Sequence, residues 1–477
     1  MPSEIGSSAP PRRRRERLSA RVRARDTVLT PRFGILWSGQ IATLIGNSIL
    51  WFAFVVHAWE SGEQASQVVW LSLASMLPKM LLSPVAGAIV DRCSKRTALQ
   101  LADLAGLVAV GGLTAVYFSG HLELWEIYAG LALGGAAIAF ADPALLSAVP
   151  VLVRKDQFQR ANGMLATANS VANVCGPAIA GFLIASVGLG AILWADLATF
   201  VVAIVTVRAA IPADSGGSRP AGRPEHGLLA DSLAGLRYIF ARPSLRGLVL
   251  VFFAVNLTMV FGFAVLPPMI LAASGNDSAA LASVMTSIGI GGIAGGLILA
   301  AHGGPKNRLR GMMLSVIGMC LTAEVAIALS RSLIWWCAAI FVGALLMPII
   351  NGTMQAIIQT KVPVGQQGRV FGAVIFFAEI SAPLAMIFAG PLADHVFQPE
   401  GLSGSGLVGL LAPLVGGGRG GGLAAMLLIA GIGGIGASVW GLASRPVRDI
   451  DVLLPDLGAE LSDETAVSDE TAEGVTA

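Results

Sequence analysis

Charged residues, cysteines and nucleotide-binding motifs are scarce in this sequence. Only 13% of its 477 residues are charged, whereas soluble domains carry about 25%. The Walker A pattern G-x-x-x-x-G-K-[ST] is absent, which argues against ATP as the energy source of this chain. The four cysteines show no C-x-x-C spacing, so we interpret them as small packing residues rather than as a disulfide framework or metal site.

Histidine is also sparse and scattered. The five histidines form no H-E-x-x-H motif and fall in loops or at the ends of apolar segments: His57, His121, His226, His302 and His395. A membrane-embedded enzyme would need such side chains clustered at one site. We therefore expect no enzymatic activity, no cofactor, no bound metal and no nucleic-acid partner.

Apolar sequence is abundant. Hydrophobic residues make up 55% of the chain, the mean hydropathy is +0.75, and there are 58 glycines, which let membrane helices approach closely. A bilayer core needs about 20 apolar residues per helix. The sequence predicts an all-α integral membrane protein with twelve such segments: 33–57, 68–90, 98–118, 125–148, 163–186, 189–209, 247–272, 279–302, 310–330, 333–357, 370–393 and 421–443.

A polar break after the sixth segment divides these spans into two halves of six. The Arg-rich N-terminus is too polar for a cleavable signal peptide, and it is either a solvated tail or a docking site for anionic lipids. The central break ends in an amphipathic stretch, 228–240, expected on the inner membrane face. The predicted regions are a basic tail 1–32, an N-terminal half 33–209, a central loop 210–246, a C-terminal half 247–444 and an acidic tail 445–477.

The positive charges predict the orientation. Of 31 Lys and Arg residues, only Arg331 and Arg419 fall in the loops opposite the N-terminus, and Lys79 lies within a span. Cytoplasmic loops are the ones enriched in Lys and Arg. We therefore predict that both termini are cytoplasmic and that the protein spans the plasma membrane.

The turn after the second span contains a recognisable motif, Gly87-Ala-Ile-Val-Asp91-Arg92-Cys-Ser-Lys95-Arg96. It resembles the signature G-x-x-x-D-R-x-x-[KR]-[KR] of the major facilitator superfamily, in residues and in position between spans two and three. The resemblance implies a twelve-helix fold of two rocking halves, a monomeric carrier, and a conformational latch in this turn that Asp103 helps to complete. The corresponding turn after span eight keeps Gly295, Gly296, Lys306 and Arg308 but lacks the Asp-Arg pair.

Two further stretches are similar to exporters of that superfamily. Gly176, Pro177 and Gly181 in span five match its antiporter motif in part, although a simple helix kink would use the same residues. The loop that holds Gly368 and Arg369, with the opening 33–40, resembles the branch of macrolide-efflux and enterobactin-type siderophore exporters. This resemblance extends over nearly all of residues 30–450.

Ionisable side chains inside the spans are functional candidates, because burying a charge in hydrocarbon is costly. Asp142, just before Pro143, can bind a proton when water leaves its surroundings and release it when water returns. We expect it to couple proton movement to transport or to contact the substrate. Lys79 and Glu379 lie at similar depth on spans two and eleven, so they form a latch, a static pair or no contact. We expect a solvated or packing role for Asp196 and Glu324.

The superfamily fold implies that spans one, four, seven and ten line the cavity. Four neutral polar residues fall on these spans and either bind substrate or join helices: Asn47, Asn256, Asn351 and Gln355. We predict a secondary active exporter of a bulky amphipathic small molecule, such as a drug, siderophore or peptide natural product, that works by proton-coupled alternating access. A proton-driven uptake carrier, a lipid flippase and a non-transporting sensor remain the alternatives.

Overall fold

The structure is a computed structural model that describes residues 30–154, 157–212 and 236–454. In these ranges the chain is helical, without strands. The first half consists of five helical elements: α2 (Pro31–Gly62), α3 (Ala65–Arg92), α4 (Lys95–Phe118), α5 (Leu124–Leu152) and α6 (Phe158–Ala210).

The second half begins with α8 (Pro243–Ser274) and α9 (Ser278–His302). Two of its membrane helices contain a π-helical segment, because α10 (Arg308–Met319) continues through η2 (Cys320–Ala326) into α11 (Ile327–Leu329), and α13 (Val364–Leu392) continues through η3 (Ala393–Phe397) into α14 (Gln398–Ser403). The remaining elements are α12 (Leu333–Lys361), α15 (Gly406–Val415), α16 (Gly418–Ala443), α17 (Arg445–Arg448) and α18 (Ile450–Leu453).

Eleven helices among the described residues are long and apolar enough to cross a membrane. One of them, α6, has 53 residues and breaks at Gly188, whose φ of 76° and ψ of 177° are not helical. Glycine adopts this positive φ without the steric cost that other residues bear. The two arms of α6 supply the fifth and sixth spans, so the prediction of twelve membrane helices is confirmed.

Side-chain caps define where several helices begin. The Thr30 side chain accepts a hydrogen bond from the Phe33 amide, and the Ser94 hydroxyl accepts one from the Thr97 amide. Asp277 caps α9 in the same way, through the Ala279 amide. Each contact satisfies a backbone donor that has no partner within its own helix, so the loops between spans can be short.

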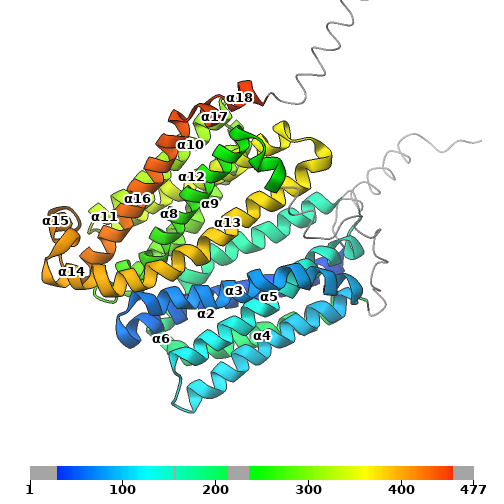
Figure 1. Ribbon diagram of the computed structural model, residues 1–477. Coiled ribbons are helices and arrows are strands. Elements are labelled where there is room, and N and C mark those ends of the chain that lie inside the picture. Colours follow the sequence, from blue (N-terminus) through cyan, green and yellow to red (C-terminus); the bar gives the residue numbers. More distant parts are fainter. Residues whose placement is uncertain (1–29, 155–156, 213–235, 455–477) are drawn as a thin grey trace, which may run out of the picture.

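The two halves form two helical bundles that meet along a seam (Figure 1). On one side of the seam α3 packs against α13, and on the other α6 packs against α9. Small residues allow this close approach: a Cβ on Gly181 of α6 would lie 2.5 Å from the Ala282 Cβ of α9. The seam is therefore built from two pairs of helices, one member from each half.

The buried core differs between the two ends of the bundles. At the end where α2 finishes, one cluster joins both halves and includes Phe54 and Trp59 from the first half and Leu266 and Leu427 from the second. At the opposite end the described residues form two separate clusters, one around Phe33 in the first half and one around Met313 in the second. The halves are thus joined hydrophobically at the Trp59 end only, as far as the described residues show.

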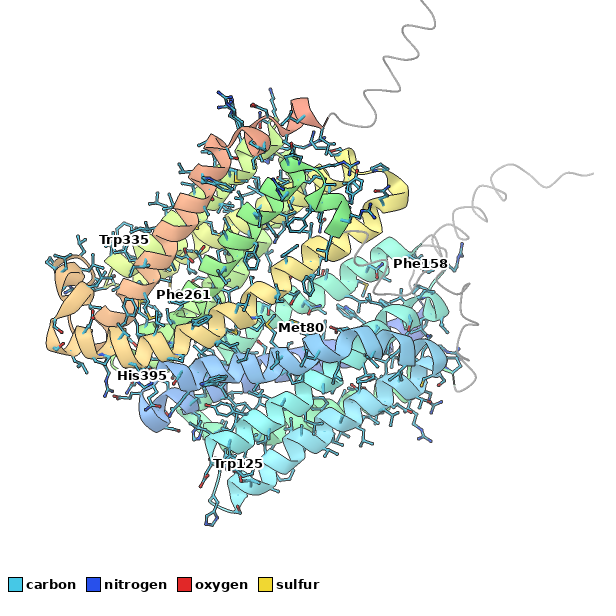
Figure 2. The ribbon with its side chains drawn as sticks, in the orientation of Figure 1. Met80, Trp125, Phe158, Phe261, Trp335 and His395 are labelled. Carbon is cyan, nitrogen blue, oxygen red and sulfur yellow. The ribbon has the colours of Figure 1, made fainter. Side chains whose placement is uncertain are left out.

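Aromatic side chains mark the surface near that joined end. Trp125 and Trp335, close to the starts of α5 and α12, are exposed and point off the bundle (Figure 2). Tryptophan favours the interface between membrane and water. Both side chains therefore fit a membrane boundary at this level.

The connecting segments differ from the predicted ones before the last span. That span, predicted from residue 421, starts earlier, because α16 begins at Gly418, and the connection before it contains the short helix α15. Of the predicted amphipathic stretch 228–240, residues 236–240 are helical and the rest lie outside the described residues. The tails predicted at 1–32 and 445–477 are described only for residues 30–32 and 445–454.

Candidate functional site

The centre of the candidate site is an ion pair within the first half. Lys79 Nζ on α3 lies 2.9 Å from Asp142 Oδ2 on α5, and the two side chains are 45% and 55% exposed. The helices come close enough because Gly135 of α5 packs on the Ser75 carbonyl of α3, which an added Cβ would strike. Lys79 therefore pairs with Asp142 and not with Glu379, which corrects the pairing suggested by helix depth.

A cavity with about 1640 Å³ of empty space, including its mouth, surrounds this pair. The polar residues that line it come from five spans of the first half: Gln40, Thr43, Asn47, Ser48, Ser75, Lys79, Asp103, Asp142, Asn169 and Asn173. Asp103 of α4 is buried, and its Oδ2 atom has no hydrogen-bond partner among the described residues. The cavity thus holds two carboxyl groups and one ammonium group, an arrangement that can exchange protons and hold a polar ligand.

A second cavity, of about 970 Å³ including its mouth, lies between the two halves. It shares Ser48, Trp51 and Asn173 with the first cavity and is bounded on the other side by α8, α9 and α12. Because the same side chains line both spaces, the two cavities are neighbours. A ligand between the halves would lie next to the space that holds the Lys79–Asp142 pair.

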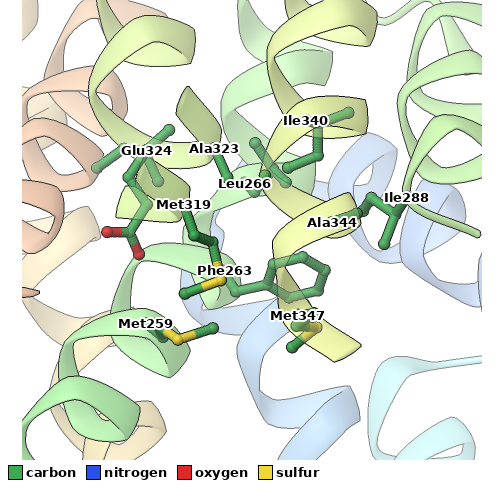
Figure 3. Close-up of a pocket in the computed structure, with 12 residues that line it drawn as sticks. Met259, Phe263, Leu266, Ile288, Met319, Ala323, Glu324, Ile340, Ala344 and Met347 are labelled. Atoms are coloured by element: carbon green, nitrogen blue, oxygen red, sulfur yellow. The ribbon is translucent and has the colours of Figure 1, made fainter. Parts of the chain in front are cut away.

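A third pocket continues this series into the second half. It is narrow, with a cavity volume of about 60 Å³, and shares Phe263, Ile288, Ala344 and Met347 with the cavity between the halves. Its one ionisable lining residue is Glu324 (Figure 3). Both Glu324 and Asp196 are buried, so the solvated role considered for them does not apply.

The structure brings together some of the predicted residues and separates others. Asp142, Lys79, Asp103 and Asn47 line one cavity. The remaining cavity candidates line none of the three spaces: Glu379, Asn256, Asn351 and Gln355. The Asn256 side chain instead donates to the Phe252 carbonyl of its own helix at 2.8 Å, so it is held by the backbone.

The predicted latch motif is only partly described. Gly87, Asp91 and Arg92 belong to α3, and Gly368 and Arg369 belong to α13, but their side chains lie outside the described part of the structure. Lys95 is buried and donates to the Val90 carbonyl at 3.3 Å, which joins the start of α4 to the end of α3. Arg96 is half-buried on the next position. The role of this turn as a latch therefore stays a prediction.

The antiporter-like residues pack at helix crossings. An added Cβ at Gly176 would collide with the Ser48 side chain of α2, and Gly181 faces α9 across the seam. Pro177 lines the cavity between the halves. These three residues of α6 thus contribute to packing within the first half, to the seam and to the cavity wall.

Sequence reasoning missed several polar residues of the first cavity, among them Gln40, Asn169 and Asn173. A usable signal was present, because Asn169 and Asn173 are four residues apart and so share one helix face. They lie on the first arm of α6, the fifth span, which is not among the spans that the resemblance assigned to the cavity wall. Their position shows that this helix serves both the interface and the cavity.

Four polar contacts hold the halves together at the Trp59 end. The Asp394 carboxylate of η3 accepts hydrogen bonds from the Ala65 and Ser66 amides of α3, at 2.7 and 3.0 Å. The Trp59 indole donates to Asn276 Oδ1 at 2.7 Å, and Glu63 forms an ion pair with Arg419. Together with the shared apolar cluster, these contacts close this end of the seam.

Comparisons with known proteins agree with this architecture. Residues 36–386 match the model of the Major Facilitator Superfamily. The chain is 26% identical to macrolide efflux protein A of Streptococcus pyogenes over 384 residues, which is 76% of this chain and 90% of that protein. It is 27% identical to the multidrug efflux pump Tap of Mycolicibacterium fortuitum over 360 residues, covering 73% and 86% of the two chains.

Solved structures show the same fold at low sequence identity. A bacterial homologue of the human lysosomal transporter Spinster, in an inward-facing and unoccupied conformation, aligns with a TM-score of 0.57 and 14% identity, covering 86% of this chain and 94% of the other. A POT family transporter in complex with a thioalcohol-conjugated peptide aligns with a TM-score of 0.61 and 9% identity, covering 86% and 95%. These likenesses describe the fold.

Proposed function

The chain belongs to the Major Facilitator Superfamily, and on that basis we propose that it is a secondary active exporter of bulky amphipathic small molecules driven by protons. As a member of that family it is a multi-pass membrane transporter and not an enzyme. The observation that carries the proposal is the Lys79–Asp142 ion pair in the wall of a large cavity beside the space between the halves. The efflux proteins similar to this chain favour export over uptake.

The uneven closure of the seam supports alternating access. The described contacts join the halves at the Trp59 end, while each half keeps its own apolar cluster at the opposite end. With both termini cytoplasmic, as the Lys and Arg distribution predicts, the joined end is the outer one. The conformation is then inward-facing, and export requires the Asp394 contacts to break while the opposite ends close.

The ion pair provides the step that couples protons to this motion. In the present geometry the Asp142 carboxylate is balanced by the Lys79 ammonium group. A proton from water that binds Asp142 neutralises the acid and frees Lys79 to contact another group; loss of the proton to the cytoplasm restores the pair. Both side chains are about half exposed, so water in the cavity can deliver and remove that proton.

Transport by purified protein in liposomes tests the proposal. A macrolide, a siderophore and a lipopeptide are assayed with and without an imposed pH gradient, for wild type and Asp142→Asn. We expect gradient-driven movement of at least one compound by wild type and its loss in the variant, because an amide cannot exchange a proton.

The matched control is Asp196→Asn, which removes a buried acid that lines none of the three spaces. Equal gradient-driven transport by Asp142→Asn and wild type would remove Asp142 from the coupling step. Movement of compounds without any dependence on the gradient would contradict proton coupling altogether.

A further inference from the structure

Glu324 is a buried acid that the proposed coupling step does not use. Its side chain is 6% exposed, and its Oε2 atom has no hydrogen-bond partner among the described residues. Among the described residues, its carboxyl group accepts a hydrogen bond from the Cys320 thiol of the same π-helical segment. Burying a carboxylate without a partner is expensive, so this group requires an explanation.

The local backbone holds the carboxyl group in place. Glu324 belongs to η2, where the helix widens from α to π geometry, a change that often marks functional sites. Two glycines leave room for the side chain: a Cβ at Gly262 of α8 would lie 2.9 Å from Glu324 Oε1, and one at Gly431 of α16 would lie 2.9 Å from Glu324 Cβ. Glu324 is thus fitted between three helices.

The pocket beside Glu324 is apolar and deformable. Figure 3 shows Glu324 at one edge, with the side chains of Met259, Met319, Met347 and Phe263 around the open space. Methionine adapts to ligands of different shape, and the face of an aromatic ring attracts cations. The pocket therefore suits the cationic group of a ligand whose apolar body extends into the adjoining cavity between the halves.

No cation of the protein balances this acid in the described structure. The pocket lining contains no Lys, Arg or His, and the helices packed against η2, namely α10, α11, α12 and α16, place no charged residue in it. Asp142 differs because Lys79 lies beside it. A carboxylate in the Glu324 pocket needs its positive partner from outside the chain.

We propose that this pocket binds the protonated amine of an amphipathic ligand, with the Glu324 carboxylate as its counterion. The ligand arrives through the cavity between the halves, which shares Phe263 and Met347 with the pocket. The acid releases its proton to water as the ammonium group takes its place, so the charge in the pocket is balanced before and after. This inference names a substrate class for the proposed exporter, but binding itself does not depend on transport.

A matched pair of fluorescent probes tests the amine requirement. Dansylcadaverine carries a primary amine on an apolar chain, and its N-acetyl derivative has the same body without the charge. Binding to the purified full-length protein is measured by dansyl fluorescence. We expect wild type to bind the amine at least about tenfold more tightly than the acetylated probe, a difference of roughly 1.4 kcal/mol.

Glu324→Gln should abolish this preference and leave binding of the acetylated probe unchanged, and Glu324→Asp should restore part of it. The control is Asp196→Asn, because Asp196 is also buried with an unpartnered Oδ2 but lines none of the three spaces. We expect the Asp196→Asn protein to keep the wild-type preference. Calorimetry in buffers with different ionisation enthalpies should show proton release on amine binding in wild type and Asp196→Asn, and none in Glu324→Gln.

Equal affinity of wild type for the two probes would overturn the inference without any variant, so a misfolded Glu324→Gln protein does not weaken the test. An unchanged amine preference in a folded Glu324→Gln protein would also overturn it. Amine-selective binding in a protein that moves no compound would sustain the pocket and contradict the exporter. Gradient-driven transport by a protein that binds both probes equally would support the exporter and contradict the amine-binding pocket.

Discussion

The two halves of the molecule place acids in their cavity walls in different ways. In the first half Asp142 has a lysine beside it and stands in a large, partly polar cavity. In the second half Glu324 lies beside a pocket lined by three methionines, Phe263 and aliphatic side chains, and none of the described lining residues is a cation. A paired and half-exposed acid can exchange protons with water, whereas an enclosed one changes its charge only when a ligand brings the compensating charge.

The contrast suggests a division of labour between halves that share one fold. In the two proposals above, the first half responds to protons and the second recognises a cationic ligand. The cavity between them borders both sites through shared side chains. The four predictions below test this division, and they begin with the largest expected effect.

Lys79→Met should make the first half resemble the second by leaving Asp142 without its countercharge. We expect gradient-driven transport in liposomes to fall at least about tenfold, equivalent to roughly 1.4 kcal/mol in the barrier. Lys79→Arg is the control and should retain most of the rate, because it keeps the positive charge. Wild-type transport by Lys79→Met would show that the pair has no part in coupling.

Met259→Lys should make the second half resemble the first by supplying a cation to the Glu324 pocket. The new ammonium group would form an ion pair with the Glu324 carboxylate in place of the ligand. The preference for dansylcadaverine over its acetylated form should therefore fall about tenfold, or roughly 1.4 kcal/mol. Met259→Leu keeps the apolar wall and should preserve the preference. If the lysine variant still selects the amine, Glu324 is not the counterion.

Asp394→Ala tests how firmly the halves are held together at the Trp59 end. The substitution removes the acceptor of the Ala65 and Ser66 amides, and loss of such a cap costs about 1 kcal/mol. We expect the population of molecules whose outer ends are separated to rise several-fold. This rise would be measured as a longer distance between spin labels on Ser61 and Ser403. An unchanged distance distribution would mean that the shared apolar cluster alone determines this closure.

Glu63→Gln addresses the same end with a smaller expected effect. Glu63 and Arg419 are both exposed to about two-fifths of their surface, and exposed ion pairs contribute less than about 1 kcal/mol. We expect a small change in the spin-label distances, and none at high salt, where such a pair is screened. A shift as large as that of Asp394→Ala would show that the pair is a principal contact between the halves.

The sequence predicted the spans better than the contacts between them. Twelve apolar segments could be predicted because membrane helices need long apolar runs. The fifth and sixth of them belong to one long helical element, α6, which is interrupted at Gly188. Lys79 and Asp142 were each identified as intramembrane charges. Their pairing was not, because it depends on the close packing of Gly135 against Ser75 rather than on depth along the helix.

The importance of Glu324 could not be judged from sequence either. A π-helical segment changes the direction of the side chains that follow it, and the pattern of apolar residues did not predict η2. Glu379 was a reasonable choice by the cost of burying charge, yet its side chain is exposed and lines none of the three spaces. The sequence does not show how each helix is rotated about its own axis, and this rotation determines the direction in which each side chain points.

The series of connected spaces also has a kinetic meaning. Among the described residues, the Lys79 cavity and the Glu324 pocket share no side chain and are linked through the cavity between the halves. A compact inhibitor at one end therefore leaves the other free. Such an inhibitor would act non-competitively against a small compound bound at the far end. Against a long substrate that reaches both ends, the same inhibitor would compete, so the form of inhibition would report the length of the molecule being carried.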